Sequence, residues 1–468
     1  MAGPAASWQS YSRCFDTIGN SMPLHRRSFL ALSLLLGAAG VVRAQPSATR
    51  YTTDQVRADL RFIEQAIAAT HPDPGFSTDP AKLQAAYRDI AAQLRAPLTR
   101  DQVWRLLATL NPVFADAHLA ITMPDGAGQC RTLFDGGGAL FPYEVVVDAG
   151  GAVTIRAELG GGASELAGMA VNAINGMPAQ RVAAELLARC HGDTPAFRAS
   201  LLAMRWPFLY WKMFGAPTVF ELTTADGRTL RVAAAARLPA YLAAQAQFDH
   251  QFALRLLPDQ AALLTLGTFA WPDKQEFLAF MAQSFTRIRE HGVRTLLIDV
   301  RDNGGGNDDF WIDGLLCYIA DKPYRWASGY KKKVIAGRTS PGEPLGAVID
   351  GTIDKWVQPA LSEALRFKGA SYLLVGSNTY SSAILLANVM QDFGFGKLVG
   401  AAGVARVRQS GGTQNFVLPN TGLALGVPRL IFNRPSAALL PDLLQPDIVL
   451  PDSPLDRQQL VDAVLKLA

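Results

Sequence analysis

Two adjacent serines, Ser381 and Ser382, follow an apolar strand-like run at residues 371–375 and a short turn, and they precede an apolar helical run at residues 383–394. A hydroxyl in this place stands at a helix N-terminus, where free backbone N–H groups and the helix dipole favour developing negative charge. A second strand-like run, residues 295–300, leads into RDNGGGN, whose glycines let backbone amides approach a substrate closely. Together the two segments predict a serine nucleophile and an oxyanion hole.

A serine hydroxyl needs a base to take its proton, so a histidine or a lysine must come from elsewhere in the chain. Five histidines lie beyond residue 44: His71, His118, His191, His250 and His291. Of these, His118 lies between a helical run and a strand-like run in VFADAHLAITM, a rigid place from which to project a base. Position alone leaves two readings open, a general base and a satisfied structural histidine.

The elements that would position these residues follow from hydrophobic periodicity. Three helical runs with Thr or Asp near their starts and Pro in the breaks come first, at residues 52–71, 79–96 and 99–111. A strand-rich region follows, with strands at 141–148, 152–159 and 170–176, a helix at 178–190, and a hairpin across 218–235 that turns at Asp226 and Gly227. From about residue 261, strands alternate with helices, which is the signature of an α/β layer.

The first 44 residues have the order of a secretory signal. The basic pair Arg26 and Arg27 precedes a 14-residue apolar stretch at residues 29–42, and Ala44 ends a small-residue site before Gln45. This stretch is too short to span a bilayer, which takes roughly 20 residues, so we predict cleavage after Ala44 and no membrane insertion. Arg-Arg-Ser-Phe-Leu resembles a twin-arginine signal, with a Sec signal as the alternative. The mature protein is expected to be periplasmic or secreted.

Composition bears on the classes of partner. Residues 1–44 carry four arginines against one aspartate, a net +3, so the rest of the +4 chain is close to neutral and nothing favours nucleic acid or an anionic membrane surface. Three cysteines remain after cleavage, Cys130, Cys190 and Cys317, with no CxxC and no Cys/His cluster. We therefore expect neither a disulfide framework nor a metal site. A Cys130–Cys190 bridge stays open as an alternative.

Four segments, in order, resemble the signatures of the tail-specific, or carboxy-terminal processing, serine peptidases and of their tricorn-core relatives. They are IDVRDNGGGN, NTYSSAILLANVMQDFGFGKLVG, FVLPNTGLALGVP and LLQPDIVLP, and FADAHLAI resembles the Asp-x-His segment of the tricorn-like branch. The resemblance covers about the whole mature chain. It implies an α/β catalytic core of the crotonase or ClpP type at residues 239–468, after an export signal (1–44), an N-terminal helical domain (45–135) and a divergent PDZ-like α+β domain (136–238).

The resemblance also implies the site residues. Ser381 is the nucleophile, because the stretch to Gly400 aligns with the family pattern without a gap. Ser382 and either Gly304 or Gly305 then supply the oxyanion-hole amides, and His118 is the general base. The implied reaction is hydrolysis of a polypeptide or peptide through an acyl-enzyme, with no metal or cofactor.

The sequence departs from the family pattern at two places. The lysine of the processing-protease branch stands 25 residues after the serine, and this position holds Arg406, which stays protonated and cannot act as a base. The tricorn-like branch has a serine before its histidine, where this chain has Ala117, and an acid near the C-terminal Pro-Asp, for which Asp442 is the candidate. Asp442 is equally compatible with a surface loop and Asp116 with a turn cap, so the group that orients His118 is unassigned.

The PDZ resemblance rests on SELAGMAVNAINGMPAQRVAAELL, residues 164–187. PDZ domains bind chain termini by adding a strand to a sheet edge, but no clear carboxylate-binding loop precedes FPYEVVV, so a structural role over the cleft is the alternative. For the whole protein, the alternative to a peptidase is a catalytically silent peptide- or lipophile-binding protein on the same fold. An α/β-hydrolase esterase is a third reading, which the missing G-x-S-x-G elbow disfavours. Oligomeric state and cleavage specificity stay open.

Overall fold

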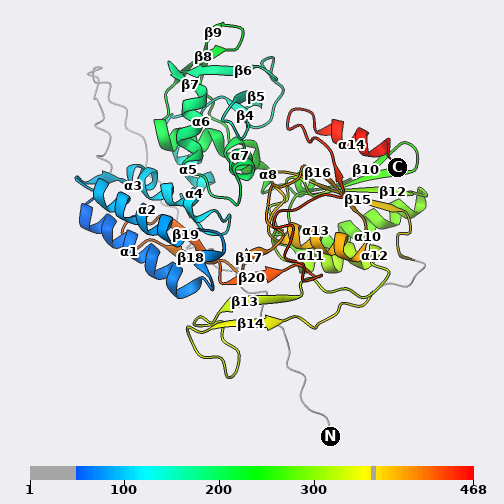
Figure 1. Ribbon diagram of the computed structural model, residues 1–468. Coiled ribbons are helices and arrows are strands. Elements are labelled where there is room, and N and C mark those ends of the chain that lie inside the picture. The colour runs from blue at the N-terminus through cyan, green and yellow to red at the C-terminus, as the bar shows by residue number, and fades with distance from the viewer. Residues whose placement is uncertain (1–48, 360–364, 468) are drawn as a thin grey trace, which may run out of the picture. The chain divides into compact units, whose positions relative to one another are not determined.

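The N-terminal part of the fold is helical, as the periodicity predicts (Figure 1). The computed structural model describes residues 49–359 and 365–467, so the expected export signal at residues 1–44 lies outside the described residues. Thr52 and Thr99 close capping boxes with Gln55 and Gln102, which satisfies free N–H groups at two helix starts. The elements here are β1 (Arg50–Tyr51), α1 (Thr53–Thr70), η1 (Pro74–Phe76), α2 (Pro80–Gln93), β2 (Leu98–Thr99), α3 (Arg100–Leu107), η2 (Ala108–Leu110), α4 (Asn111–Phe114) and α5 (Gly126–Asp135).

The middle of the chain forms an antiparallel sheet in the order β4-β5-β6-β8-β9. The predicted strands and hairpin are present, and Gly227 has φ +83° in the hairpin turn. One long helix, α7 (Pro195–Phe214), is absent from the predicted elements, because its interior Pro207 and its apolar residues on nearly every side hide the helical period. The other elements are β4 (Tyr143–Val147), β5 (Val153–Glu158), β6 (Ala170–Ile174), β7 (Met177–Pro178), α6 (Ala179–Leu187), β8 (Val219–Thr224) and β9 (Thr229–Ala233).

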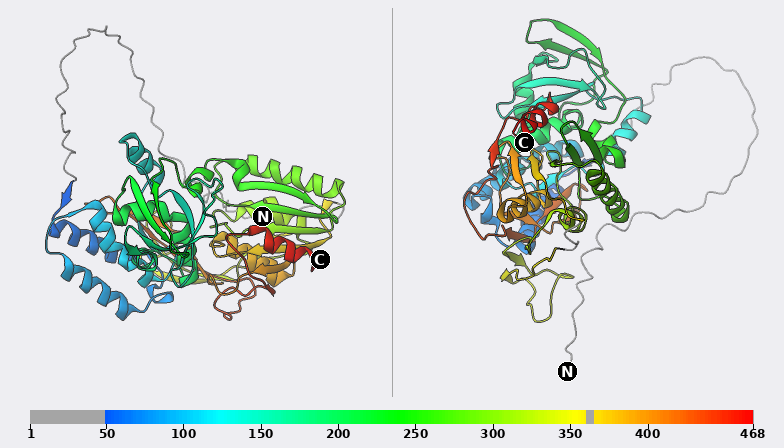
Figure 2. Two further views of the ribbon diagram at one scale, coloured as in Figure 1. Left: turned by 90° about the horizontal axis from the view of Figure 1, so that it is seen from above. Right: turned by 90° about the vertical axis from the view of Figure 1, so that its right-hand side faces the viewer.

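The C-terminal part carries a six-stranded sheet in the order β10-β11-β12-β15-β16-β21, parallel except for the β10–β11 pair. Helices cover both of its faces (Figure 1, Figure 2). Leu460, Val461 and Val464 of α14 pack on one face, while α10 and α13 bury apolar side chains against the other. This is the α/β layer that the alternating pattern predicts.

In this layer the RDNGGGN loop follows β12 and the serine pair follows β15. In chain order its elements are α8 (Ala240–Ala244), α9 (Phe248–Gln251), β10 (Phe252–Leu257), β11 (Ala261–Leu266), α10 (Lys274–Glu290), β12 (Thr295–Asp299), α11 (Asp309–Trp311), the π-turn η3 (Ile312–Leu316), α12 (Cys317–Ile319), β15 (Ala370–Val375), α13 (Ser382–Phe393), β16 (Lys397–Gly400), β21 (Ile448–Val449) and α14 (Arg457–Leu465). Because β12 and β15 are parallel neighbours, the two loops leave the same edge of the sheet.

Strand β3 (Ala120–Thr122), which follows His118, pairs with a strand from the far end of the sequence. Its partner is β19 (Ala424–Val427), which forms a hairpin with β18 (Gln414–Val417). A four-stranded sheet, β14-β13-β20-β17, is connected to both ends of this hairpin, since β17 precedes β18 and β20 follows β19 in the chain. Its strands are β13 (Gly329–Lys333), β14 (Val348–Thr352), β17 (Gln409–Gly411) and β20 (Leu430–Asn433). The β3–β19 pairing carries the His118 segment to the C-terminal region.

Among the described residues, no helix has the length and apolar character needed to cross a membrane. Cys130, Cys190 and Cys317 carry free thiols, so the Cys130–Cys190 bridge is not formed in this structure. The division of the chain at residues 135 and 238, and the PDZ likeness of its middle part, stay predictions.

Candidate active site

Ser381 stands at a strained turn between β15 and α13. Its backbone has φ +54° and ψ −124°, a conformation that residues other than glycine rarely adopt. Hydrogen bonds on both sides hold it there: the Ser381 N–H donates to Gln409 Oε1 at 3.1 Å, and the Tyr380 N–H donates to the Asn303 carbonyl at 3.0 Å. Although no G-x-S-x-G motif is present, the turn resembles a nucleophile elbow in its strand–turn–helix form and its strain.

The Ser381 hydroxyl meets the imidazole of His118. Ser381 Oγ lies 2.9 Å from His118 Nε2, although 263 residues separate the two in sequence. His118 lies between α4 and β3, and the pairing of β3 with β19 fixes this segment. A nucleophile and a base within hydrogen-bond reach are the first geometric requirement of acyl transfer. The structure therefore brings together the two residues that the sequence pairs only through a family resemblance.

A serine and an aspartate lie behind the imidazole. Ser410 Oγ is 2.9 Å from His118 Nδ1 and donates to Asp116 Oδ1 at 2.8 Å. The same carboxylate oxygen accepts the backbone N–H of His118 at 2.7 Å. Because the Ser410 hydroxyl gives its proton to Asp116, it accepts the proton of Nδ1, which leaves the Nε2 lone pair facing Ser381. The imidazole is thus held in the tautomer that a general base needs.

Ser410 is a site residue that the sequence does not reveal. Its surroundings, RQSGGT, contain no motif, and its partner Asp116 is nearly 300 positions away. Asp116 caps the turn at His118, which is the role that the sequence analysis considers for it. The same carboxylate also accepts the hydrogen bond of the Ser410 hydroxyl. The Asp-x-His spacing is the one local signal that could have found this acid.

Asp442, the acid suggested by the family resemblance, does not face His118. Its side chain is 58% exposed, and its Oδ2 lies 3.8 Å from Arg406 Nε. The surface-loop reading therefore describes Asp442. The carboxylate behind the imidazole belongs to Asp116, whose side chain is only 1% exposed.

Arg406, at the position of the processing-branch lysine, holds the His118 segment in place. Its guanidinium donates to the Ala115 carbonyl at 2.6 Å, and its backbone N–H donates to Asp193 Oδ2 at 3.0 Å. The other Asp193 oxygen accepts the Tyr380 hydroxyl at 2.7 Å, from the residue before the nucleophile. Burial, and then the charge of Asp116, raises the pKa of Asp193 to about 6, and Arg406 opposes this shift. Arg406 and Asp193 thus join the histidine segment to the serine turn.

The two serines of the pair have different surroundings. The Ser382 side chain is buried, accepts the indole N–H of Trp311 at 2.9 Å and donates to Asp308. Its hydroxyl is therefore engaged, while its backbone N–H lies in the first turn of α13, where no intrahelical acceptor exists. Ser381 is left as the hydroxyl that contacts a base.

The glycine loop passes directly beside the serine turn. A Cβ on Gly305, which has φ +103°, would lie 2.5 Å from Ser381 Cβ and 2.9 Å from Ser382 N. The Gly305 N–H itself donates to Asn303 Oδ1 at 2.8 Å, whereas the Gly304 N–H has no hydrogen-bond partner within the described part of the chain. Only glycine fits at position 305, and Gly304 offers the free amide of the two.

Burial sets the charge state of His118. Desolvation lowers the pKa of its imidazole below the ordinary 6.5, and the charge of Asp116 partly opposes this. The imidazole is therefore neutral at neutral pH, which is the form that can accept the Ser381 proton.

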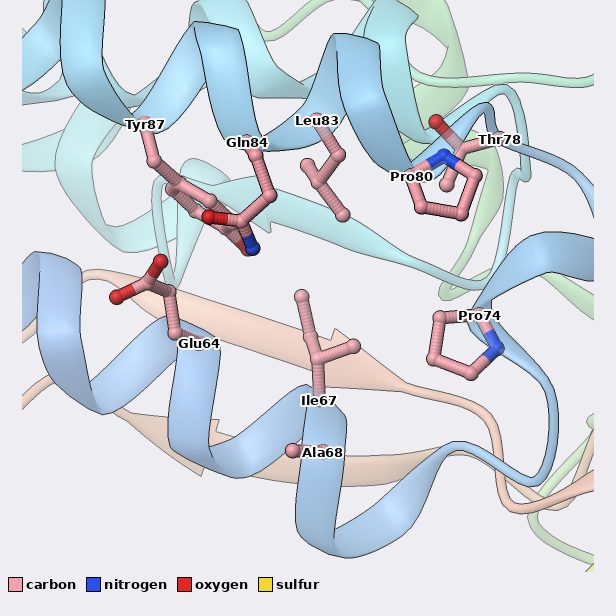
Figure 3. A pocket seen from close by; sticks show the side chains of 9 residues that line it. All are labelled: Glu64, Ile67, Ala68, Pro74, Thr78, Pro80, Leu83, Gln84 and Tyr87. Carbon is pink, nitrogen blue, oxygen red and sulfur yellow. The ribbon is translucent and has the colours of Figure 1, made fainter.

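Two cavities differ in their relation to this geometry. One, of about 400 Å³, is lined by Ala117 and His118 and by parts of α7, β18 and β19. The other, of about 180 Å³, lies between α1 and α2, where Ile67 and Glu64 face Leu83, Gln84 and Tyr87 (Figure 3). The two share no lining residue. Of the Ser381–His118 pair, His118 lines the first cavity and Ser381 does not.

Comparison with known proteins gives a family match for the C-terminal part of the chain. Residues 261–450 match the family described as Peptidase family S41. The structure is similar to that of mature CPAF, with 16% sequence identity and a TM-score of 0.60 over 89% of this chain and 97% of the other. It is also similar to mature CPAF complexed with lactacystin, with 16% identity and a TM-score of 0.61 over 89% of this chain and 98% of the other. A photosystem II D1 C-terminal processing protease is also similar, with 16% identity and a TM-score of 0.46 over 88% of this chain and 97% of the other. At this identity the CPAF likeness is one of fold, and no curated protein matches the chain.

Proposed function

We propose that this chain, whose residues 261–450 match Peptidase family S41, is a serine peptidase that hydrolyses peptide bonds through an acyl-enzyme on Ser381, with His118 as the general base. The observation that carries the proposal is the 2.9 Å contact between Ser381 Oγ and His118 Nε2. The Ser410–Asp116 pair behind Nδ1 supports it, because it fixes the tautomer that leaves Nε2 free to accept a proton.

In the first half of the reaction, His118 Nε2 takes the Ser381 proton while Oγ attacks the carbonyl carbon of the scissile peptide. The tetrahedral intermediate collapses when the imidazolium gives that proton to the leaving amine, so the C–N bond breaks and an ester on Ser381 remains. Asp116, through Ser410, stabilises the imidazolium that forms between these two transfers.

In the second half, His118 deprotonates a water, which attacks the ester carbonyl. The proton then returns from the imidazolium to Ser381 Oγ as the acyl group leaves as a free acid. The proposed oxyanion donors in both halves are the N–H groups of Ser382 and Gly304. The Ser382 amide is a helix-terminal donor, and of Gly304 and Gly305 it is Gly304 whose amide has no acceptor among the described residues.

We propose export to the periplasm or the medium from the pattern of residues 1–44 alone. A mature chain that begins at Gln45 is the measurable sign, and a cell-retained chain that keeps residues 1–44 would contradict it.

A silent binding protein on the same fold is the alternative function. Its support in the sequence is the lack of the family lysine and of a clear third catalytic group. Ser410 and Asp116 lie behind the imidazole, where a third group would stand, which argues against the second of these two grounds; the first, Arg406 in place of the lysine, remains. A binding protein would also have no need for the strained backbone at Ser381.

Covalent labelling with a fluorophosphonate tests the proposal. The wild-type protein should label on Ser381, Ser381→Ala should not label, and His118→Ala should label more slowly by a factor of about 10² or more. The matched controls are Ser284→Ala, which removes a buried hydroxyl on α10, and His291→Ala at the exposed end of α10. Both should label as the wild type does. A wild type that does not label, or a Ser381→Ala variant that does, would overturn the assignment.

A further inference from the structure

The cavity beside His118 is built from segments that meet only in the folded chain. Its wall combines the turn at Ala117 and His118, residues 189–191 after α6, the middle of α7 and the β18–β19 hairpin. With a volume of about 400 Å³, it falls within the range of small-molecule and side-chain sites. Because His118 lines it, an occupant of the cavity would lie beside the imidazole that contacts Ser381.

The charge of this cavity is one-sided. Its lining residues, all within the described part of the chain, include Arg189 and Arg205 but no aspartate or glutamate. Arg189 is already engaged, since it donates to Glu185 Oε2 at 3.0 Å and to the Arg105 carbonyl at 3.0 Å. Arg205 has no ion-pair partner within 4.0 Å among the described residues. The cavity therefore holds one guanidinium whose charge is not compensated locally.

The immediate neighbour of Arg205 adds no countercharge. Arg205 Nη1 lies 3.4 Å from His191 Nε2, and the buried Nε–H of Arg205 has no acceptor among the described residues. Burial, and next the charge of Arg205, lowers the pKa of His191 to about 3, so His191 is neutral and accepts from the guanidinium. A partly buried guanidinium with unused donors is costly unless an anion completes its hydrogen bonds.

We propose that this cavity is a substrate subsite that takes a carboxylate, with Arg205 as its partner. The inference rests on the proposed function, because it supposes a peptide held at Ser381. A carboxylate matches the planar fork of arginine and can accept two of its N–H groups at once. Asn415 and Tyr241, which also line the cavity, offer neutral polar groups around it. The carboxylate has two possible sources in a peptide, an acidic side chain or the α-carboxylate at the chain end.

A set of synthetic peptide libraries separates these sources. The first pair of libraries differs only in whether Glu or Gln is placed at each position. The second pair differs only in whether the C-terminus is a free acid or an amide. The wild type should cleave the carboxylate member of at least one pair roughly 10- to 100-fold more efficiently, the range expected for a hydrogen-bonded charge in a partly desolvated site. The Glu/Gln pair responds if a side chain is bound, and the acid/amide pair responds if the chain end is bound.

Variants of α7 connect the preference to Arg205. Arg205→Gln should reduce the ratio to within about threefold of unity, and Arg205→Glu should favour libraries with lysine in place of glutamate. Arg198→Gln, two turns earlier on α7 and outside the cavity lining, should keep the wild-type ratio. A wild type without a carboxylate preference, or an Arg205→Gln variant that retains it, would overturn the inference.

Fluorophosphonate labelling of the same variants distinguishes the two possible failures. If Arg205→Gln labels on Ser381 at the wild-type rate but no library pair is discriminated by the wild type, only the carboxylate subsite is wrong. If the wild type does not label at all, the proposed function fails first.

Discussion

The proposed nucleophile, Ser381, and the proposed base, His118, reach the same point of the molecule in different ways. Ser381 is placed by consecutive elements, the end of β15, a short turn and the start of α13, and the neighbouring loop after β12 closes against it. His118 is placed by groups from separate segments: Asp116 beside it, Asp193 before α7, and Arg406 and Ser410 after β16. Half of the pair is therefore local in sequence, and the other half depends on long-range contacts.

Substitutions should therefore affect the two sides of the pair differently. The serine half, the turn at Ser381 with the glycine loop beside it, is tightly packed, so a single added methyl group should displace it. The histidine half, His118 with the groups that hold its segment, depends on several hydrogen bonds. Removal of one of them should lower the reaction rate only in part.

The largest effect is expected from Gly305→Ala. The new Cβ would lie 2.5 Å from Ser381 Cβ and 2.9 Å from Ser382 N, at a backbone φ of +103° that alanine rarely adopts. The serine turn must shift, which misplaces both Oγ and the Ser382 amide. We expect acylation by a fluorophosphonate to slow by about 10² to 10³.

Gly162→Ala is the control, since a Cβ there comes no closer than 3.6 Å to any neighbouring atom and the residue lies outside the site. It should label at close to the wild-type rate, whereas Gly305→Ala should not. If Gly305→Ala and the wild type label at equal rates per folded molecule, the close packing of the glycine loop against the serine turn does not control the position of Ser381.

A smaller effect is expected from Ser410→Ala. The substitution removes the hydroxyl between His118 Nδ1 and Asp116 Oδ1, so the imidazole loses the acceptor that fixes its tautomer. We expect the acylation rate to fall by about 10 to 10², the order that second-layer partners of a catalytic histidine contribute. Stopped-flow or gel-based labelling over time measures it.

Ser328→Ala provides the comparison for a lost buried hydroxyl, because Ser328 is also buried and donates to the Arg434 carbonyl far from the histidine. A similar loss of rate in both variants would mean that Ser410 acts through stability alone. A changed pH profile in Ser410→Ala, with none in Ser328→Ala, would place its effect on the imidazole.

The smallest effect is a shift in pH dependence. Burial lowers the pKa of His118, and the neutral imidazole is the working form. The acid limb of the labelling rate should therefore have its midpoint below pH 6.5 in the wild type. Asp116 raises this pKa, since its negative charge favours the imidazolium, so Asp116→Asn should move the midpoint to still lower pH while the plateau rate falls.

A limb at or above pH 6.5 in the wild type, or one that moves upward in Asp116→Asn, would contradict the electrostatic account of the histidine half. An exposed aspartate provides the control: Asp54→Asn on α1 should leave the midpoint unchanged.

Much of the fold could be predicted because its signals are local. The capped N-terminal helices, the hairpin at Gly227 and the strand–helix alternation of the core all appear in the hydrophobic period and in turn residues. The longest helix that the sequence analysis does not predict is α7, where Pro207 and apolar residues on nearly every side hide the helical period; shorter elements such as α5, β10, β13 and β14 are also absent from the prediction. Helix α7 carries Arg205, so the cavity beside His118 was equally hidden.

The sequence by itself determined the serine turn and the glycine loop, because a strand, a short turn and a helix within a few tens of residues define one another. It also provided the Asp-x-His segment, but with two readings. Only the tertiary structure set His118 against Ser381, put Ser410 behind the imidazole, and left the exposed carboxylate of Asp442 beside Arg406. The physical reason is that hydrogen bonds between side chains nearly 300 residues apart depend on strand pairing and packing, which leave no trace in the local pattern of residues.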